Sequence, residues 1–219
     1  MPKELKIPDE LDLNAFISKE AHDLKSPFNR ALGFLKLVLK GMDGPISDQA
    51  REDLTIVSLN IQYSLTMIEA LVNMARLGRG ERSLTATPLP VDYILPQTVS
   101  EWKRKYHKEN PVEITYTSSE IQVNVDEIMI RQGLQQWISY VNEFTQESAA
   151  IEIRVEDQPE GAVFTVESRG TKRQPPPECD LTMYGFVGQK IVELHGGQLL
   201  IVAETEQGAQ VQFRLPKAE

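Results

Sequence analysis

Two long segments of helical periodicity, joined by one short turn, constrain the fold of this chain most. Breakers are few between residues 10 and 80, and the turn GMDGP at residues 41–45 separates the two segments. In each segment apolar positions recur at alternating spacings of three and four residues, as in a bundle seam. The seams comprise Ile17, Ala21, Leu24, Phe28, Ala31, Leu35 and Val38, then Leu54, Val57, Ile61, Ser64, Ile68, Leu71 and Ala75. Since further apolar residues flank both seams, we expect two hairpins to pair into a homodimer with a four-helix bundle.

The composition changes near residue 80, where a second domain follows the hairpin of residues 10–80. Gly, Pro, Ser and Thr without periodicity indicate a linker at 81–90, and the domain occupies 91–219. We expect strands at 112–116 and 121–125, a helix at 127–145, strands at 151–155 and 163–166, a helix ending at His195, and strands at 199–203 and 210–215. This order predicts an α+β fold, a two-layer sandwich of sheet and helices.

The charge balance excludes several classes of partner. The chain has 219 residues, with 23 Lys and Arg against 32 Asp and Glu, which gives a formal net charge of −9. A negative surface argues against nucleic acid as a partner. No apolar run reaches the roughly 18 residues of a membrane span, and the first residues lack the apolar segment of a signal peptide, so we expect a cytoplasmic protein without membrane insertion. The single cysteine, Cys179, excludes an internal disulfide and a cysteine-based metal cluster.

One segment of the first helix carries candidate chemistry. His22 directly follows the seam residue Ala21, so it lies on the flank of the seam, where a partner can reach it. Asp23 can hold one ring N–H, which fixes the tautomer and leaves the other nitrogen as a nucleophile. Pro27 lacks the N–H that would bond the carbonyl four residues earlier, so we expect a kink beside His22. From these residues alone, a solvated surface histidine remains the alternative.

The motif HDLKSP at residues 22–27, with Phe16 before it and the hairpin after it, resembles the dimerisation and histidine-phosphotransfer domain of two-component sensor histidine kinases. The resemblance implies that His22 is phosphorylated and exchanges its phosphoryl group with an aspartate of a response-regulator receiver, which supplies Mg²⁺. It makes Asp23 the acid/base partner. The family's phosphatase activity uses a threonine or asparagine three places further on, where this chain has a serine. The candidates for phosphatase or docking support are Lys25, Ser26 and Pro27.

Residues 88–216 resemble the ATP-binding domain that follows the hairpin in the same family, most closely at KIVELHGGQLLIVAETEQGAQVQFRLP. The family's nucleotide boxes are largely replaced. Gln136 and Tyr140 stand in the places of two asparagines, and Ser168 stands in the place of the adenine-binding aspartate. Glu143 occupies a place that is often basic, and its carboxylate would repel a triphosphate. A phosphate-binding glycine loop should precede IVELHGG, but its glycines are at the wrong spacing. The degenerate positions are Gln136, Tyr140, Glu143, Ser168, Gly170, Gly185 and Gly188.

Two further features have simple structural explanations. His195 lies in the last turn of a helix, where a cation interacts favourably with the last carbonyls. A basic cluster surrounds His107 on an otherwise acidic chain, and it comprises Lys103, Arg104, Lys105 and Lys108. A solvated helix face explains this cluster most simply, and a docking patch for an acidic partner is the alternative.

Three functions remain open. The first is a histidine phosphotransfer protein or pseudokinase, whose ATPase-like domain has lost ATP binding. We expect no cofactor of its own, and the receiver would supply Mg²⁺. The second is an active ATP-dependent sensor histidine kinase with divergent nucleotide boxes. The third is a non-catalytic regulator that binds another histidine kinase or a response regulator. The motif at His22 favours the first two over the third, and the joint change in three boxes favours the first over the second.

Overall fold

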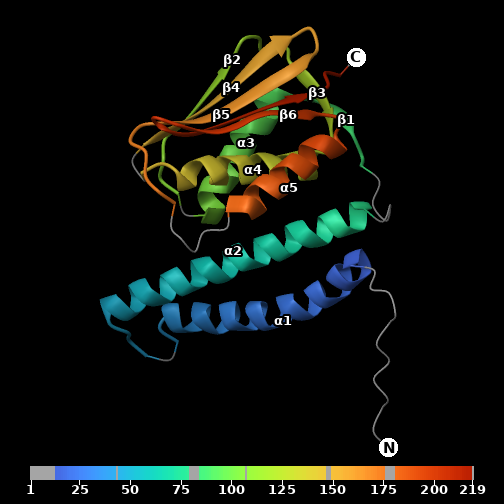
Figure 1. Cartoon of the computed structure of the whole chain (residues 1–219). Coiled ribbons are helices and arrows are strands. Elements are labelled where there is room, and N and C mark those ends of the chain that lie inside the picture. Colours follow the sequence, from blue (N-terminus) through green and yellow to red (C-terminus); the bar gives the residue numbers. More distant parts are fainter. Residues whose placement is uncertain are drawn as a thin grey trace, which may run out of the picture. The chain divides into compact units, whose positions relative to one another are not determined.

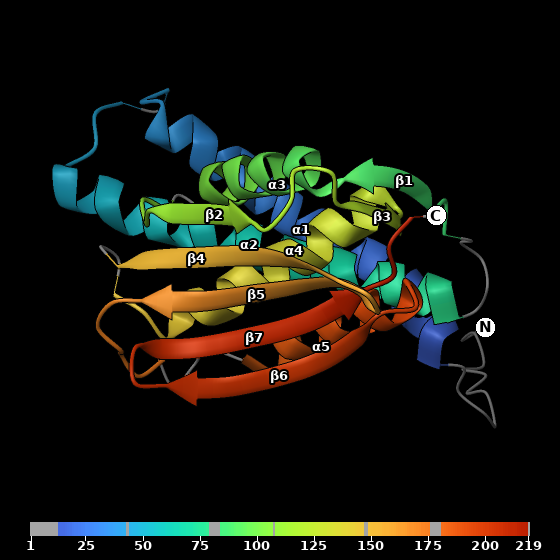
Figure 2. The same ribbon diagram turned by 90° about the horizontal axis from the view of Figure 1, so that it is seen from above.

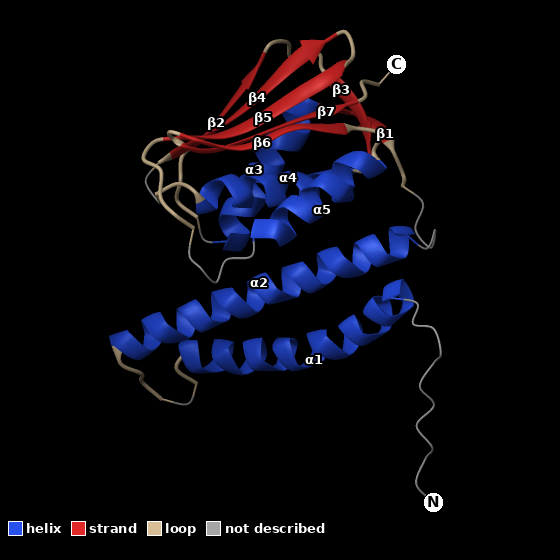
Figure 3. Cartoon of the chain, viewed as in Figure 1, coloured by secondary structure: helices blue, strands red, loops and turns tan. Residues whose placement is uncertain are grey.

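The computed structural model describes residues 13–42, 44–78, 84–106, 108–146, 149–175 and 181–218. The chain divides between residues 83 and 84 into two compact units. The first is a pair of α-helices, and the second contains all the strands together with three helices (Figure 1, Figure 3). His107 and Cys179 lie outside the described residues.

The first unit is a helical hairpin of α1 (Leu13–Leu39) and α2 (Asp48–Gly78), which pack against each other. A hydrogen-bonded turn closes α1, in which the N–H of Met42 donates to the carbonyl of Leu37 over 3.1 Å. Gly41 adopts the left-handed conformation (φ 73°) that this kind of helix end requires. The glycines of GMDGP therefore end the first helix and allow the chain to reverse.

A single hairpin buries only part of the predicted seam. Ala21 and Ala75 are buried, but the seam residues Leu24 and Val57 are 52% and 45% exposed. Phe34, beside the seam, is 69% exposed. Each helix of an isolated pair can bury only one face, so the hairpin leaves a row of large apolar side chains uncovered.

The second unit is a five-stranded sheet covered on one face by helices. Its elements are β1 (Thr87–Pro90), α3 (Val91–Tyr106), β2 (Val112–Tyr116), β3 (Gln122–Val125), α4 (Glu127–Glu143), β4 (Ala150–Gln158), β5 (Gly161–Arg169), α5 (Leu181–Leu194), β6 (Gln198–Thr205) and β7 (Gly208–Leu215). The sheet has the order β2-β4-β5-β7-β6, in which only β2 and β4 are parallel (Figure 2). The predicted α+β fold class is confirmed.

Two tryptophans organise the helical layer of this unit. Trp102 and Trp137 are fully buried, and the indole N–H of Trp102 donates to the hydroxyl of Ser139 over 2.8 Å, which joins α3 to α4. Gly188 of α5 lies against the ring of Trp137, since a Cβ there would approach the ring to 2.5 Å. The close approach of α5 to α4 therefore requires glycine at residue 188.

The start of the second unit differs from the sequence prediction. Residues 87–90, assigned to the linker, form β1, which pairs antiparallel with β3. Its two prolines obscure the strand pattern in the sequence, because proline within a sheet is confined mainly to edge strands and strand ends. The helix α3 is missing from the predicted order, and Pro96 within it interrupts the pattern. The buried residues of α3, which keep helical spacing, are Val91, Ile94, Leu95, Thr98, Val99 and Trp102.

Candidate functional site

The HDLKSP motif lies on α1. The backbone of His22 is helical and directly follows the buried Ala21, while the side chain of His22 lies outside the described residues. Asp23 is exposed. Pro27 lies inside the helix, and Figure 1 shows α1 changing direction along its length. A proline has no N–H for the carbonyl four residues earlier, which accounts for such a bend.

The other motif residues lie at the surface of the hairpin. Ser26 and Pro27 are exposed, and the Nζ of Lys25 lies 3.6 Å from Oε1 of Glu69 on α2. Such a pair between partly exposed groups contributes at most about 1 kcal/mol. It nevertheless links the motif to the second helix. Of the residues expected to support phosphatase activity or docking, Ser26 and Pro27 are thus exposed on the hairpin and Lys25 is partly exposed.

Three of the seven degenerate nucleotide-box positions lie on one stripe of α4. Gln136 is fully buried, and neither polar atom of its amide has a hydrogen-bond partner among the described residues. The ring of Tyr140 packs edge-on against Trp137, with centroids 6.1 Å apart. Burial, and secondarily the carboxylate of Glu204, raises the pKa of Tyr140. The stripe therefore combines an unpaired amide with an aromatic surface.

Glu143, the third residue of this stripe, is neutralised by an arginine that the sequence analysis missed. The Nη2 of Arg173 lies 3.1 Å from a carboxylate oxygen of Glu143, and Nε of the same guanidinium donates to the Glu143 carbonyl over 3.1 Å. The N–H of Arg173 also donates to the carbonyl of Phe144. The chain after β5 is thereby fixed to the end of α4. The repelling carboxylate expected from the sequence is present but paired.

Ser168, in the place of the adenine-binding aspartate, takes part in the core. It is buried, its hydroxyl donates to the carbonyl of Val141, and it accepts a hydrogen bond from the N–H of Ala209, each over 3.3 Å. These bonds connect α4, β5 and β7. Gly170 lies close to Ala149, whose Cβ would be 2.5 Å from a Cβ at residue 170. Both positions have structural contacts within the second unit.

The expected glycine loop is helical in the described stretch. Gly185 and Gly188 both lie inside α5, which begins at Leu181. Within a helix, N–H groups beyond the first turn bond to carbonyls four residues earlier, so they cannot surround a phosphate. Gly185 and Gly188, predicted to be degenerate positions of the family's glycine loop, are thus part of a helix in this chain. Tyr184, which directly precedes Gly185, is buried.

The structure brings most of the degenerate positions together around the C-terminal half of α4. Gly188 lies against the ring of Trp137, and the hydroxyl of Ser168 donates to the carbonyl of Val141; both partners belong to this half of α4. The ion pair between Lys172 and Glu204, 2.6 Å long, lies nearby, since Glu204 influences the pKa of Tyr140. No local pattern in the sequence identifies the ion pairs Lys172–Glu204 and Glu143–Arg173, because the two partners of each pair are about thirty residues apart.

His195 joins the start of α4 to the end of α5. Its Nε2 accepts a hydrogen bond from the N–H of Asp126 over 3.1 Å, and its Nδ1 lies 2.7 Å from the carbonyl of Ile191, so the proton is on Nδ1. Burial lowers the pKa of His195 from its ordinary value of 6.5. The structural role expected for His195 fits these bonds, but the ring is neutral, not a cation at the helix end.

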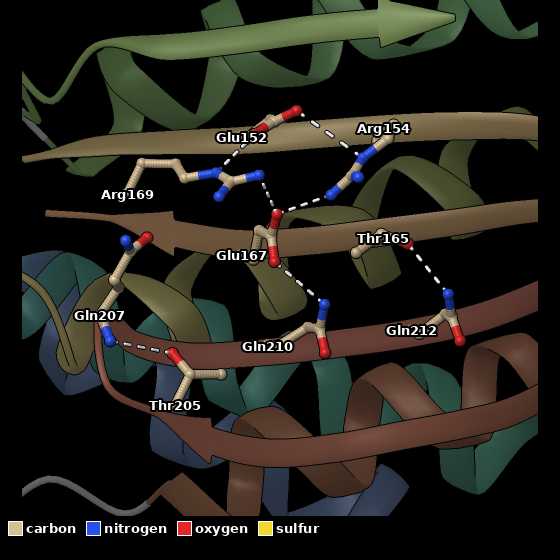
Figure 4. Close-up of polar contacts among 9 residues, drawn as sticks. All are labelled: Glu152, Arg154, Thr165, Glu167, Arg169, Thr205, Gln207, Gln210 and Gln212. Carbon is tan, nitrogen blue, oxygen red and sulfur yellow. Dashed lines mark hydrogen bonds and ion pairs between the residues drawn. The ribbon is translucent and has the colours of Figure 1, made fainter. Parts of the chain in front are cut away.

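The outer face of the sheet carries a polar network, shown in Figure 4. The carboxylate of Glu167 lies 2.6 Å from the guanidinium groups of both Arg154 and Arg169, and it accepts a hydrogen bond from Gln210 over 3.0 Å. Arg169 also bonds to Glu152 over 2.6 Å. The two arginines are thus neutralised by acids of their own sheet.

Neither a metal site nor a membrane span is found within the described ranges. No group of three or more His, Cys, Asp or Glu side chains there is arranged to hold a metal ion. None of the helices in this part of the chain has both the length and the apolar character that crossing a membrane requires.

Three curated relatives align with most of the chain. They are the circadian input-output histidine kinase CikA of Synechococcus elongatus (20% identical over 92% of this chain), the methanogenesis regulatory histidine kinase FilI of Methanothrix harundinacea (22% over 94%) and the phytochrome-like protein Cph1 of Synechocystis (22% over 94%). The chain spans 30%, 25% and 29% of the length of these relatives. No family model matches the chain.

Solved structures show the same arrangement of elements. Full-length ShkA in complex with AMPPNP matches 94% of this chain with a TM-score of 0.67 at 18% identity, and the match covers 46% of ShkA. The histidine kinase AdeS of Acinetobacter baumannii matches 90% of this chain with a TM-score of 0.61 at 16% identity, and the match covers 98% of that structure. At these identities the likeness establishes the fold, a helical hairpin followed by an α/β unit.

Proposed function

We propose that this chain, a homologue of the sensor histidine kinases of two-component signalling, is a histidine phosphotransfer protein with an α/β unit that does not bind ATP productively. His22 exchanges a phosphoryl group with the aspartate of a response-regulator receiver. The proposal rests on the motif of α1, which retains a histidine, a carboxylate and a proline in the family's order.

The transfer itself needs few groups from this chain. One nitrogen of the neutral imidazole of His22 attacks the phosphorus of the receiver's aspartyl phosphate, the P–N bond forms, and the P–O bond to the aspartate breaks. The aspartate leaves as a carboxylate, and Asp23 holds the proton on the other ring nitrogen, which stabilises the positive charge on the phosphorylated ring. The receiver brings the Mg²⁺ that neutralises the phosphoryl oxygens. Reversal of the same step returns the phosphoryl group.

The proposed loss of ATP binding rests mainly on Ser168, whose hydroxyl is hydrogen-bonded within the core. Its hydroxyl donates to Val141 and accepts from Ala209, so its hydrogen-bonding capacity serves the core. Adenine recognition in the family requires an acceptor at this place that is free to face the base. The Glu143–Arg173 pair and the helical glycines of α5 support the same conclusion from two further boxes.

The exposed apolar residues of the hairpin support a dimer. Leu24, Phe34 and Val57 are too exposed in one hairpin for large apolar side chains that lie on or beside a seam. A second hairpin would cover them and form a four-helix bundle. The flank position of His22 then remains accessible to a receiver.

A transfer assay tests this function. A receiver phosphorylated with a small-molecule donor is mixed with the wild-type chain, with His22→Gln, and with His107→Gln as the matched histidine control. We expect acid-labile phosphate on the wild type and on the control, and none on His22→Gln. If no receiver of the same genome transfers phosphate to the wild type, the chain is a non-catalytic regulator and the proposed transfer is wrong.

One observation favours a second candidate, an ATP-dependent kinase with divergent boxes. The amide of Gln136 is buried without a partner among the described residues, and such a group costs about 1–3 kcal/mol. A bound nucleotide or its hydrated metal ion would satisfy it. Direct measurement of ATP binding, with Gln136→Leu as the variant that removes the amide, separates the two candidates.

A further inference from the structure

The positive charges of the second unit are distributed unevenly among its elements. In its described part, each Lys and Arg outside residues 103–108, from Arg131 to Lys217, forms an ion pair with an acid. The arginines of the sheet face in Figure 4 are examples. In the same described part, Lys103, Arg104 and Lys108 form no ion pair or side-chain hydrogen bond. These three residues are called the α3 basic surface below.

The fold holds the α3 basic surface together. Lys103 and Arg104 lie in the last turn of α3, and the N–H of Lys108 donates to the carbonyl of Lys103 over 3.1 Å. Lys108 is thereby tied to the same end of the helix. The side chain of Arg104 is exposed, and those of Lys103 and Lys108 are half-buried. Among described residues 103–109, Glu109 is the one acid, so the surface is locally positive on a chain of net charge −9.

An open groove continues from this surface along α3 towards α4. Its volume is about 390 Å³, and it is lined by Pro96, Gln97, Ser100, Glu101, Arg104 and Arg131. The guanidinium of Arg131 lies 2.5 Å from Glu101 and 3.0 Å from Glu127, so it holds both carboxylates near the groove. Arg104 therefore remains as the unpaired cation at the groove, and Gln97 and Ser100 add uncharged polar groups.

We propose that the α3 basic surface and this groove form a docking site for an acidic segment of a partner protein. Carboxylates of the segment would pair with Arg104, Lys103 and Lys108, and its backbone would lie in the groove, where Ser100 offers a hydroxyl. Charge complementarity selects this occupant. Three unpaired cations match a few carboxylates, whereas a nucleic acid needs an extended positive footprint, which the net charge of −9 opposes. The site lies outside the transfer chemistry of His22, so it does not depend on the proposed function.

A helix-dipole role is the competing explanation, since cations near a helix C-terminus stabilise the helix. That role predicts a loss of thermal stability on substitution and no effect on any partner. Glutamine has nearly the helix propensity of lysine and arginine, so Lys103→Gln, Arg104→Gln and Lys108→Gln remove charge without breaking α3.

Fluorescence anisotropy on the full chain tests the docking site. The probes are a labelled glutamate-rich peptide, the same peptide with glutamine in place of glutamate, and a single-stranded oligonucleotide of equal charge. The triple Gln variant is compared with a matched control that loses the same charge elsewhere, Lys40→Gln, Lys190→Gln and Lys217→Gln. We expect the wild type to prefer the glutamate peptide, the triple variant to bind it about tenfold more weakly, and the control to match the wild type. Failure to bind the peptide, equal weakening in the control, or tighter binding of the oligonucleotide would overturn the proposal.

Discussion

The motif residues of the hairpin lie at a helix surface, whereas most of the nucleotide-box positions of the α/β unit have entered internal contacts. Asp23 and Ser26 are exposed on α1, and Leu24, which lies between them in the sequence, is 52% exposed. In the second unit, Ser168 bonds within the core and Glu143 is paired with Arg173. The first unit presents its motif residues at the surface, where they could act on another molecule. In the second unit, these two residues at nucleotide-box positions bond to other parts of the same unit. This difference supports a division between a transferring hairpin and a scaffold.

Adding a charge to the exposed apolar side of the hairpin should have the largest effect. Phe34→Glu places a carboxylate where we expect the partner hairpin. Loss of one buried Phe is worth about 1.5–3 kcal/mol, and the symmetric dimer loses it twice, so its dissociation constant should rise by about 10²-fold or more. Sedimentation equilibrium measures this. Asn29→Glu, at an exposed polar position of α1, is the control with equal charge. An unchanged dimer in Phe34→Glu would remove the main argument for the bundle.

The two glycines of α5 should respond in opposite directions. In Gly188→Ala the new Cβ would approach the ring of Trp137 to 2.5 Å, so we expect a loss of about 1–3 kcal/mol in the free energy of unfolding. In Gly185→Ala the new Cβ meets nothing within 4 Å, so better helix propensity should stabilise the unit by up to about 1 kcal/mol. Urea unfolding followed by tryptophan fluorescence measures both. Equal effects would mean that α5 does not pack as described.

Removing the hydroxyl of Ser168 tests its internal role directly. In Ser168→Ala the buried N–H of Ala209 loses its acceptor, and we expect a cost of about 1–2 kcal/mol. Thermal unfolding of the full chain measures this, and Ser26→Ala on the exposed face of α1 serves as the matched control. A neutral Ser168→Ala would show that the hydroxyl is not needed by the core and would weaken the comparison between the units.

Acidification should affect the second unit through His195. Because burial lowers the pKa of the folded imidazole below 6.5, the unfolded chain binds the proton first as the pH falls. Stability from this group is therefore complete above about pH 6.5 and is lost progressively at lower pH. Protonation of Nε2 would also remove the acceptor for the Asp126 N–H. Unfolding free energies between pH 7.5 and 5 should fall less steeply in His195→Gln than in the wild type, and equal slopes would contradict this assignment.

The sequence predicted the features that depend on local pattern. The hairpin, its glycine turn and most strands follow from periodicity, and the position of HDLKSP on a helix follows from the same pattern. It could not predict β1, because prolines obscure the strand and the pairing with β3 is long-range. The Glu143–Arg173 pair joins residues thirty positions apart, so no spacing rule identifies it. The need for glycine at residue 188 also depends on tertiary packing, since the ring of Trp137 occupies the space that a side chain there would take.

Measurement of ATP binding by the 219-residue chain distinguishes a phosphotransfer protein from an active kinase. Titration calorimetry with Mg²⁺ and ATP, combined with incubation in radiolabelled ATP, compares the wild type with His22→Gln. We expect no binding heat up to millimolar ATP and no label on His22. Micromolar ATP affinity, together with label on the wild type that disappears in His22→Gln, would contradict it and establish an active kinase with divergent nucleotide boxes.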